Sequence, residues 1–255
     1  MAYEFIKLDL AQGLATLTLN REPLNVLNIA MMKEMNQALD SLMGQGVKVL
    51  LIKAEGKAFS AGVDVGEHLG EMVNEMIEVF HGIFRRMDAL DCVSVASVQG
   101  AALGGGCELA VYCDLVVASA KATFAQPEIM VGVFPPIAAL AFPRQIGHKK
   151  ALELILTGDT IGAEESMRLG LVNQVVAPEE LATATDKLVA KLMKLSGLVL
   201  RLSKKAILKG LKEPDPADAL KKIEKVYLKE LMPTHDAEEG LKAFLEKRAP
   251  VWQDE

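Results

Sequence analysis

The sequence predicts an α/β body followed by an α-helical C-terminal region. Short apolar segments alternate along the first part of the chain with amphipathic patterns of helical period, which is typical of α/β proteins. After Pro178 the pattern is almost entirely helical, with interruptions at Ser196-Gly197, Pro214, Pro216 and Pro233. We therefore expect two units, a core of residues 1–197 that contains the functional site and a helical region of residues 198–255.

Strands and helices are predicted to follow one another through residue 118. Thr16 and Thr18 alternate with apolar residues, which is the period of a half-buried strand, and apolar residues then recur at helical spacing from Met31 onward. A nearly continuous apolar run at residues 47–52 indicates a strand covered on both faces. The predicted strands are residues 14–19, 47–52, 93–98 and 115–118, and the predicted helices are residues 29–42, 72–87 and 105–112.

The second part of the core contains shorter predicted elements. Helices are expected over residues 137–146, 149–156 and 163–169, and a strand over residues 171–176. In the earlier helix at 72–87, a methionine-rich apolar stripe runs from Met72 to Met87 at helical spacing, so we expect this stripe to face the core.

The composition of the 255 residues excludes several classes of protein. Hydrophobic residues make up 51% and charged residues 24%, which is typical of a globular protein. The net charge of −6 argues against a nucleic-acid binder, since phosphate neutralisation requires a surplus of Lys and Arg. The sequence contains no long uncharged apolar run and no basic leader, so we expect no membrane segment. Three cysteines without disulfide or zinc spacing indicate reduced thiols and a cytoplasmic protein.

Two loops that follow predicted strands are rich in small residues, so their side chains leave the backbone amides accessible. One runs over residues 58–64, and the other, over residues 99–108, contains three consecutive glycines from Gly104 to Gly106. Such a turn at a helix start allows close approach of a ligand and directs unpaired N–H groups at an anion. A phosphate loop would need Lys and Ser/Thr after the glycines, and a dinucleotide fingerprint has another spacing. Close packing and an oxyanion site remain as interpretations.

Two glutamates in apolar surroundings are candidates for proton transfer. Glu108 comes directly after the glycine turn, where a negative charge is unfavourable for phosphate but suits proton transfer beside a developing oxyanion. Glu128 follows 20 residues later in an apolar segment, where a lone glutamate is usually a helix cap or a surface ion-pair partner. Alternatively, the two carboxylates could hold a water between them, one ionised and one protonated.

Three segments together closely resemble the crotonase superfamily, that is, the enoyl-CoA hydratases and isomerases. They are KAFSAGVDV at residues 57–65, LGGGCELA at residues 103–110 and QPEI at residues 126–129. Either of the first two would be a weak signal alone, but their order and spacing match as well. Residues 158–175 and 240–248 extend the resemblance over essentially the whole chain.

The resemblance implies a crotonase fold, a spiral of ββα units with a C-terminal α-helical region used for trimer contacts. The protein would then be a homotrimer or a homohexamer, its substrate an acyl-CoA thioester, and it would need no metal and no cofactor apart from the CoA of the substrate. The amides of Val63 and Gly105 would form the oxyanion hole, and Glu108 and Glu128 would activate water and deliver a proton to the α-carbon.

The presence of both glutamates favours a hydratase, which is a hydro-lyase, among the activities of the superfamily. Isomerase and thioester or C–C hydrolase chemistry on the same fold are alternatives. The non-enzyme alternative is an RNA-binding homologue, and the net charge of −6 together with the paired glutamates speaks against it.

The sequence departs from the usual hydratase pattern after Glu128. Hydratases usually continue through a glycine-rich PGAGGTQ stretch, whereas this chain has bulkier residues that include Phe134 and Pro135. Together with PLNVLN at residues 23–28, this stretch resembles the cyclohexa-1,5-diene-1-carbonyl-CoA hydratases, which add water to a cyclic dienoyl-CoA. A straight-chain enoyl-CoA is the main alternative substrate.

The resemblance also indicates where the substrate binds. Two lysines common in the family are replaced by Glu22 and Gly66, so Lys247 in the mildly basic tail is the expected cation for the CoA phosphates, from this or a neighbouring subunit. The four histidines lack the spacing of metal ligands, and Cys107 is expected to be a small buried side chain. The residues expected to contact the substrate are Leu24, Ala61, Gly62, Asp64, Val65, Phe134, Pro135 and Lys247.

Overall fold

The structure of the protein, a computed structural model, describes residues 3–255 and contains two β-sheets. The larger sheet has six strands in the order β1-β2-β3-β4-β6-β9, all parallel except for the antiparallel pair β1–β2. Its strands are β1 (Ile6–Ala11), β2 (Leu14–Leu19), β3 (Val49–Ala54), β4 (Val93–Val98), β6 (Leu115–Ser119) and β9 (Gln174–Val176). The smaller sheet contains β5 (Ala101–Leu103), β7 (Thr123–Ala125) and β8 (Ile161–Gly162).

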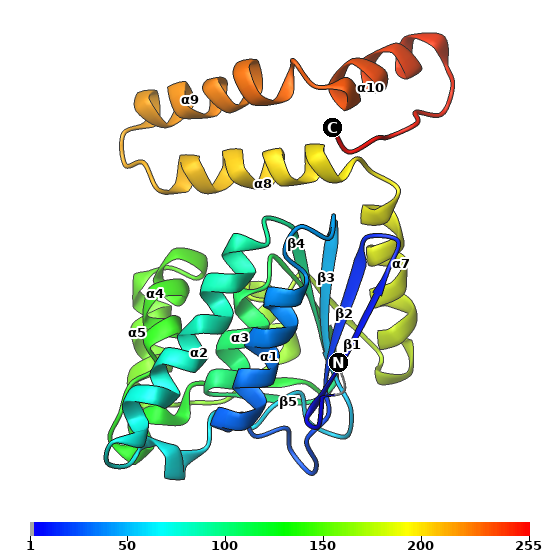
Figure 1. Cartoon of the computed structure of the whole chain (residues 1–255). Coiled ribbons are helices and arrows are strands. Elements are labelled where there is room, and N and C mark those ends of the chain that lie inside the picture. The colour runs from blue at the N-terminus through cyan, green and yellow to red at the C-terminus, as the bar shows by residue number, and fades with distance from the viewer. Residues whose placement is uncertain (1–2) are drawn as a thin grey trace.

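Helices cover both faces of the larger sheet (Figure 1). The helices α1 (Ile29–Ser41), α2 (Met72–Ala89) and α3 (Gly105–Tyr112) lie on one face, and α7 (Leu181–Met193) lies on the other. In β3, Leu50 and Ile52 belong to the main core, whereas Val49 and Leu51 pack with Val189 of α7. The structure confirms the predicted burial of this strand on both faces, although the strand runs over residues 49–54 and not 47–52.

Two successive units repeat the order of large-sheet strand, small-sheet strand and helix. β4, β5 and α3 form one unit, and β6, β7 and α4 (Pro136–Gln145) form the next. β4 pairs in parallel with β6, and β5 pairs in parallel with β7, so each unit is displaced by one strand from the unit before it. This arrangement confirms the predicted spiral of ββα units.

Helix α2 presents its apolar stripe to the core, as predicted. Met76, Phe80, Ile83 and Met87 are all buried there. Met72, in the first turn, is instead exposed, so the buried stripe begins one turn later than the sequence pattern indicated.

The sequence pattern did not predict β1, at the N-terminal edge of the large sheet, or the short strands of the small sheet. β5, β7 and β8 have only three, three and two residues, which is too short for a period to show. The strand expected at residues 171–176 begins only at Gln174. Gly170 ends α6 (Ala163–Leu169) in the left-handed region, and the amides of Leu171 and Val172 both donate to the carbonyl of Ser166. Leu171 and Val172 therefore lie in a turn, and not in a strand, although their side chains pack in the core.

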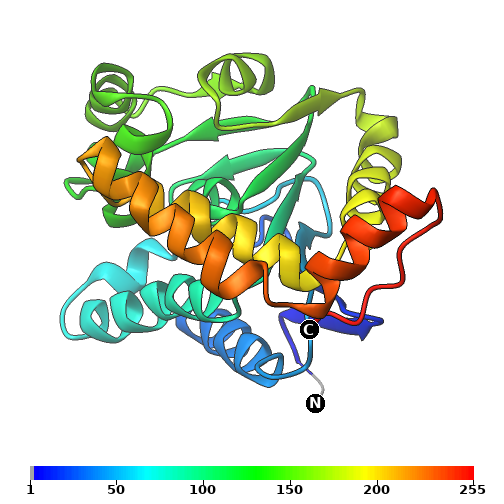
Figure 2. The ribbon, with the colours of Figure 1, turned by 90° about the horizontal axis from the view of Figure 1, so that it is seen from above.

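The C-terminal region is a layer of helices at the amino ends of the central strands. It contains α8 (Gly197–Leu211), α9 (Pro216–Lys225), a π-helical segment (Val226–Leu231) and α10 (His235–Glu246). Lys204 Nζ of α8 donates to the carbonyl of Cys92 (2.9 Å) just before β4, and to Asp114 Oδ2 (2.7 Å) just before β6. Figure 1 shows α8 between the sheet and α10, and Figure 2 shows α8 and α9 crossing the body side by side.

The remaining helix of the body, α5 (His148–Thr157), packs against α4. Across residues 3–255, no helix has the length and apolar character needed to cross a bilayer.

Candidate active site

The loop after β3 and the loop between β4 and α3 pack directly against each other. Ser60 and Ala102 form a parallel bridge, and the amide of Leu103 donates to the Ser60 carbonyl over 2.9 Å. The amide of Phe59 donates to the carbonyl of Ala101 over the same distance, 2.9 Å. Both loops follow the carboxyl ends of parallel strands, which is where α/β proteins commonly bind ligands.

A buried hydrogen-bond network fixes the path of the first loop. The side-chain amide of Asn25 donates to the carbonyls of Glu55 (2.9 Å) and Ala58 (3.0 Å). The hydroxyl of Ser60 donates to the carbonyl of Asn25 (2.7 Å) and accepts from the amide of Gly62 (3.2 Å). The backbone up to Val63 is therefore positioned before any ligand binds.

Close contacts explain the glycines at the start of α3. A Cβ atom on Gly105 would lie 2.7 Å from Cγ2 of Val63, and one on Gly106 would lie 2.6 Å from the carbonyl oxygen of Ser60. Both distances are too short for a real side chain, so the close-packing interpretation of the glycine turn is correct. In addition, the amides of Val63 and Gly105 donate to no acceptor among residues 3–255. Two free donors in neighbouring loops can bind a developing oxyanion.

Glu108 lies in the first turn of α3 and is almost completely buried, with 1% of its surface exposed. Its Oε1 atom accepts a hydrogen bond of 2.7 Å from the amide of Ala138 in α4. Burial raises the pKa of Glu108 to about 8, even though the hydrogen bond from Ala138 favours the charged form.

Glu128 lies in the 3-10 helix Pro127–Val131, directly after β7. Its Oε2 atom is buried and has no hydrogen-bond partner among residues 3–255, and its Oε1 atom lies against Gly104. Burial raises the pKa of Glu128 to about 7. The charge of Glu128 also raises the pKa of Glu108, so the structure brings the two predicted glutamates into one electrostatic environment.

Most of the predicted substrate-contacting residues follow one another around the first loop. The carbonyl of Leu24 accepts from the amide of Ala61 over 2.9 Å, and Gly62 adopts a φ of 97° that suits glycine. Asp64 accepts from the amide of Gly66 over 2.9 Å, and Val65 is exposed.

The other predicted substrate contacts lie in two different places. Phe134 is exposed and Pro135 is buried in the segment between Glu128 and α4. Lys247 ends α10 and is exposed, in the helical layer at the opposite end of the sheet from the two loops. The structure therefore does not bring Lys247 of this chain to the glutamates.

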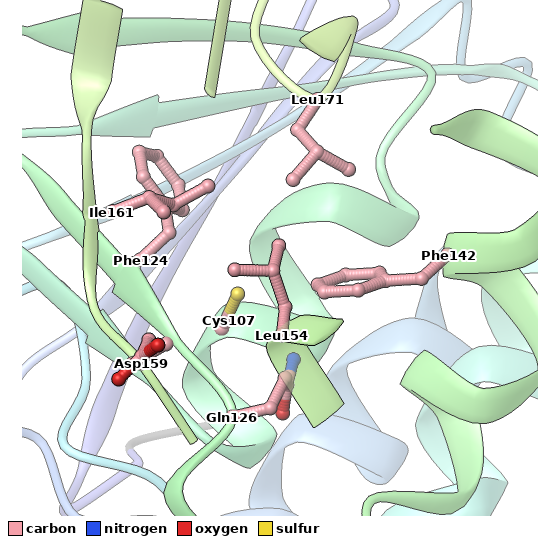
Figure 3. Close-up of a pocket in the computed structure, with 9 residues that line it drawn as sticks. Cys107, Phe124, Gln126, Phe142, Leu154, Asp159, Ile161 and Leu171 are labelled. Atoms are coloured by element: carbon pink, nitrogen blue, oxygen red, sulfur yellow. The ribbon is translucent and has the colours of Figure 1, made fainter. Parts of the chain in front are cut away.

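The residue before Glu108, Cys107, lies in a tightly packed apolar pocket. Figure 3 shows Phe124, Phe142, Leu154, Ile161 and Leu171 around Cys107 in this pocket. Burial raises the pKa of the Cys107 thiol, which is completely buried, as the sequence predicted. Within residues 3–255 no three His, Cys, Asp or Glu side chains are grouped as a metal would require.

Sequence reasoning missed the residues that hold the two glutamates in place. Ala138 contributes its backbone amide to Glu108, and Gly104 leaves room for Oε1 of Glu128 because it has no side chain. A backbone donor has no signature in residue type. The one available signal was the pair Pro135-Pro136, which marks the start of a helix at this point.

Comparison with known proteins identifies relatives along the whole chain. A sequence model described as enoyl-CoA hydratase/isomerase matches residues 9–255. The chain is 37% identical over 255 residues to a crotonyl-CoA hydratase from Syntrophomonas wolfei, covering 97% of both chains. It is 36% identical over 243 residues to a cyclohexa-1,5-dienecarbonyl-CoA hydratase from Thauera aromatica, covering 95% of this chain and 93% of that one.

Solved structures give the same result for the fold. An enoyl-CoA hydratase from Bacillus anthracis superimposes with a TM-score of 0.92 at 30% identity, over 99% of this chain and 100% of that chain. An enoyl-CoA hydratase from Mycobacterium smegmatis superimposes with a TM-score of 0.91 at 31% identity, over 98% and 99% of the two chains.

Proposed function

Because the chain belongs to the enoyl-CoA hydratase/isomerase family and is a hydro-lyase of the enoyl-CoA hydratase type, we propose that Glu108 and Glu128 add water to an α,β-unsaturated acyl-CoA. The observation that carries this proposal is the pairing of two buried carboxyl groups with two free amides. The pKa values of Glu108 and Glu128, about 8 and about 7, allow one group to be protonated and the other ionised near neutral pH.

The amides of Val63 and Gly105 are proposed to bind the thioester carbonyl oxygen. When water adds to the β-carbon, charge moves onto this oxygen and an enolate develops. Donors that are already aimed at the oxygen stabilise the transition state without reorganising, and the loss of one such donor typically costs about 10² to 10³ in rate.

The two glutamates are proposed to divide the proton transfers. The ionised carboxylate takes a proton from the water as its oxygen forms the bond to the β-carbon, and the protonated carboxyl group gives its proton to the α-carbon. One molecule of water is added in total, and the two glutamates end with their protonation states exchanged. No electrons are transferred to or from the substrate, so the proposed reaction needs no redox cofactor.

For the acyl group, cyclohexa-1,5-diene-1-carbonyl-CoA is the proposed substrate. The bulky segment with Phe134 and Pro135 supports a specialised acyl site, and the relative from Thauera aromatica supports a cyclic dienoyl group. A straight-chain enoyl-CoA is the second candidate, because the relative from Syntrophomonas wolfei is named for crotonyl-CoA.

Hydration assays with the purified protein distinguish these substrates. Cyclohexa-1,5-diene-1-carbonyl-CoA and crotonyl-CoA are each incubated with the wild-type protein and with Glu108→Gln, and the mass of the products is measured. If only the diene gains one water, the cyclic substrate is supported. If only crotonyl-CoA gains one water, the substrate is a straight-chain enoyl-CoA. If neither substrate gains water, the proposed hydration is wrong for both.

The oligomeric state is proposed to be a trimer or a hexamer formed through the helical layer. Large apolar side chains are exposed on this layer, including Leu211 in α8, Leu228 after α9, and Phe244 and Leu245 in α10. Large exposed apolar side chains gathered on one layer are typical of subunit contacts. Analytical ultracentrifugation of the protein measures the assembly directly, and a monomer at micromolar concentration would contradict the proposal.

A further inference from the structure

One short segment joins the two glutamates. It runs from Glu128 to Ala138, and we call residues 128–138 the arch. Glu128 lies at its first position, and the amide at its last position donates to Oε1 of Glu108 over 2.7 Å. The amide of Val133 donates to the carbonyl of Glu128 over 3.1 Å, which closes the first half of the arch on itself. A change in the path of the arch would therefore displace both carboxyl groups.

The free amides in the first turn of α4 donate to the carboxyl group of Glu108. In the first turn of a helix the N–H groups have no partner within the helix. Here Pro136 has no N–H, and the amide of Ala139 already donates to the carbonyl of Pro135 over 2.9 Å. The amides that remain belong to Ile137 and Ala138, and both favour the charged form of Glu108. The first turn of α4 thus binds the carboxylate of Glu108.

Two consecutive prolines restrict the backbone at this point. Pro135 is the N-cap of α4, with φ −83° and ψ 106°, and Pro136 is the first helical residue. Each proline ring fixes its own φ, and a residue that precedes proline is held in an extended conformation. The two rings therefore restrict the backbone directly before the Ala138 amide.

On these grounds, and resting on the proposed hydratase function, we propose that Pro136 is a positioning residue for Glu108. With Pro135 it fixes the first turn of α4 so that the Ala138 amide donates to Oε1 of Glu108. Oε2 of Glu108 is then the oxygen that exchanges protons with water or substrate. Phe134 is exposed in the middle of the arch and directly precedes these two prolines in the chain. An acyl group that contacts Phe134 therefore acts on the segment that positions both glutamates.

The test compares Pro136→Gly and Pro136→Ala with Pro143→Ala. Pro143 is exposed in the same helix, five residues beyond Ala138, so its replacement controls for the loss of a proline from α4. Pro136→Gly should lower kcat roughly tenfold or more, with KM unchanged within about twofold, because misplaced catalytic groups reduce the rate of chemistry. Pro136→Ala should give a smaller loss in the same direction, and Pro143→Ala should behave as the wild type.

A second measurement does not depend on activity. The carboxyl carbon of Glu108 is titrated by NMR in protein labelled with ¹³C-glutamate, with Glu108→Gln identifying the signal. If the prolines hold the donors in place, Pro136→Gly weakens the stabilisation of the charged form, and the titration moves to higher pH. An unchanged titration and an unchanged kcat in Pro136→Gly would overturn the positioning role. If the wild type hydrates neither substrate, the proposed function fails, while the titration still decides whether Pro136 positions Glu108.

Discussion

Oε1 of Glu128 lies 2.6 Å from the position that a Cβ atom on Gly104 would occupy. Gly104 has φ 50° and ψ −128°, a conformation that residues with a side chain rarely adopt. Its amide donates to the carbonyl of Ala125 (2.9 Å), and its carbonyl accepts from the amide of Glu108 (2.9 Å). A single glycine therefore contacts both glutamates and precedes the free amide of Gly105.

The substitution Gly104→Ala should reduce kcat by about 10² or more while the protein still folds. The new methyl group would overlap Oε1 of Glu128 and displace that carboxyl group, and positioned acid or base groups typically contribute about 10² to 10⁴ in rate. The measurement is steady-state hydration kinetics, together with the melting temperature of each variant.

The matched control is Gly44→Ala. Gly44 also has a positive φ, 73°, but a Cβ atom there would meet nothing within 4 Å. A side chain at Gly44 therefore also meets the strain of a positive φ, but it contacts no carboxyl group. If both variants lost activity equally, backbone strain and not displacement of Glu128 would explain the loss.

The substitutions Glu108→Gln and Glu128→Gln should each lower kcat by roughly 10² or more. Glutamine has the same shape and can still accept a hydrogen bond, but it neither takes up nor releases a proton. Cys107→Ala, at the position before Glu108 in the same buried helix, should keep activity within a few-fold. Wild-type activity in either glutamine variant would contradict the proton-transfer mechanism.

The raised pKa values of the glutamates also predict how stability depends on pH. The pKa of Glu108 is about 8 in the folded protein against an ordinary value of 4.5, so between these values the folded state binds a proton that the unfolded state has released. The stability of the wild type should therefore fall as the pH rises from about 4.5 to about 8.

Glu108→Gln removes the part of this dependence that comes from Glu108, while the part that comes from Glu128 remains. The melting temperature of the variant should therefore exceed that of the wild type by a few degrees near pH 8 and by little near pH 4.5. Differential scanning calorimetry at both pH values measures the difference. A constant difference across the range would mean that Glu108 does not carry the raised pKa.

The parts of the site that need a particular side chain could be predicted from the sequence. The parts that need only a backbone group in the right place could not. Glu108 and Glu128 were identifiable because only a carboxyl group can perform their chemistry. The Ala138 amide and the contact between Gly104 and Glu128 were not, since any residue has an amide and many glycines occur in turns.

The same distinction applies to the fold. The helix at residues 105–112 was predicted with the bounds that the structure shows, because the glycine cluster after the strand at 93–98 marks a turn into a helix. β8, with two residues, is held only by its pairing with β7, which depends on chain segments almost forty residues apart. Tertiary pairing of this kind leaves no period in the local sequence.

Lys247→Ala should raise KM for the acyl-CoA substrate several-fold if Lys247 binds a CoA phosphate. The control is Lys242→Ala, in the same helix, where the exposed lysine pairs with Glu238. An acyl-pantetheine substrate, which lacks the nucleotide and its phosphates, should show no difference between Lys247→Ala and the wild type. An unchanged KM for the CoA substrate would exclude Lys247 from binding.

A mixing experiment then shows which subunit supplies the lysine. Lys247 lies in the helical layer beyond the amino ends of the strands, whereas Glu108 lies beyond the carboxyl ends, so one chain cannot bring both to one substrate without a large rearrangement. In mixed oligomers of Lys247→Ala and Glu108→Gln chains, a site that takes Glu108 from the first chain and Lys247 from the second is intact. Recovery of the wild-type KM in the mixture, but in neither variant alone, would show that the lysine acts across a subunit boundary, whereas no recovery would exclude this role of Lys247.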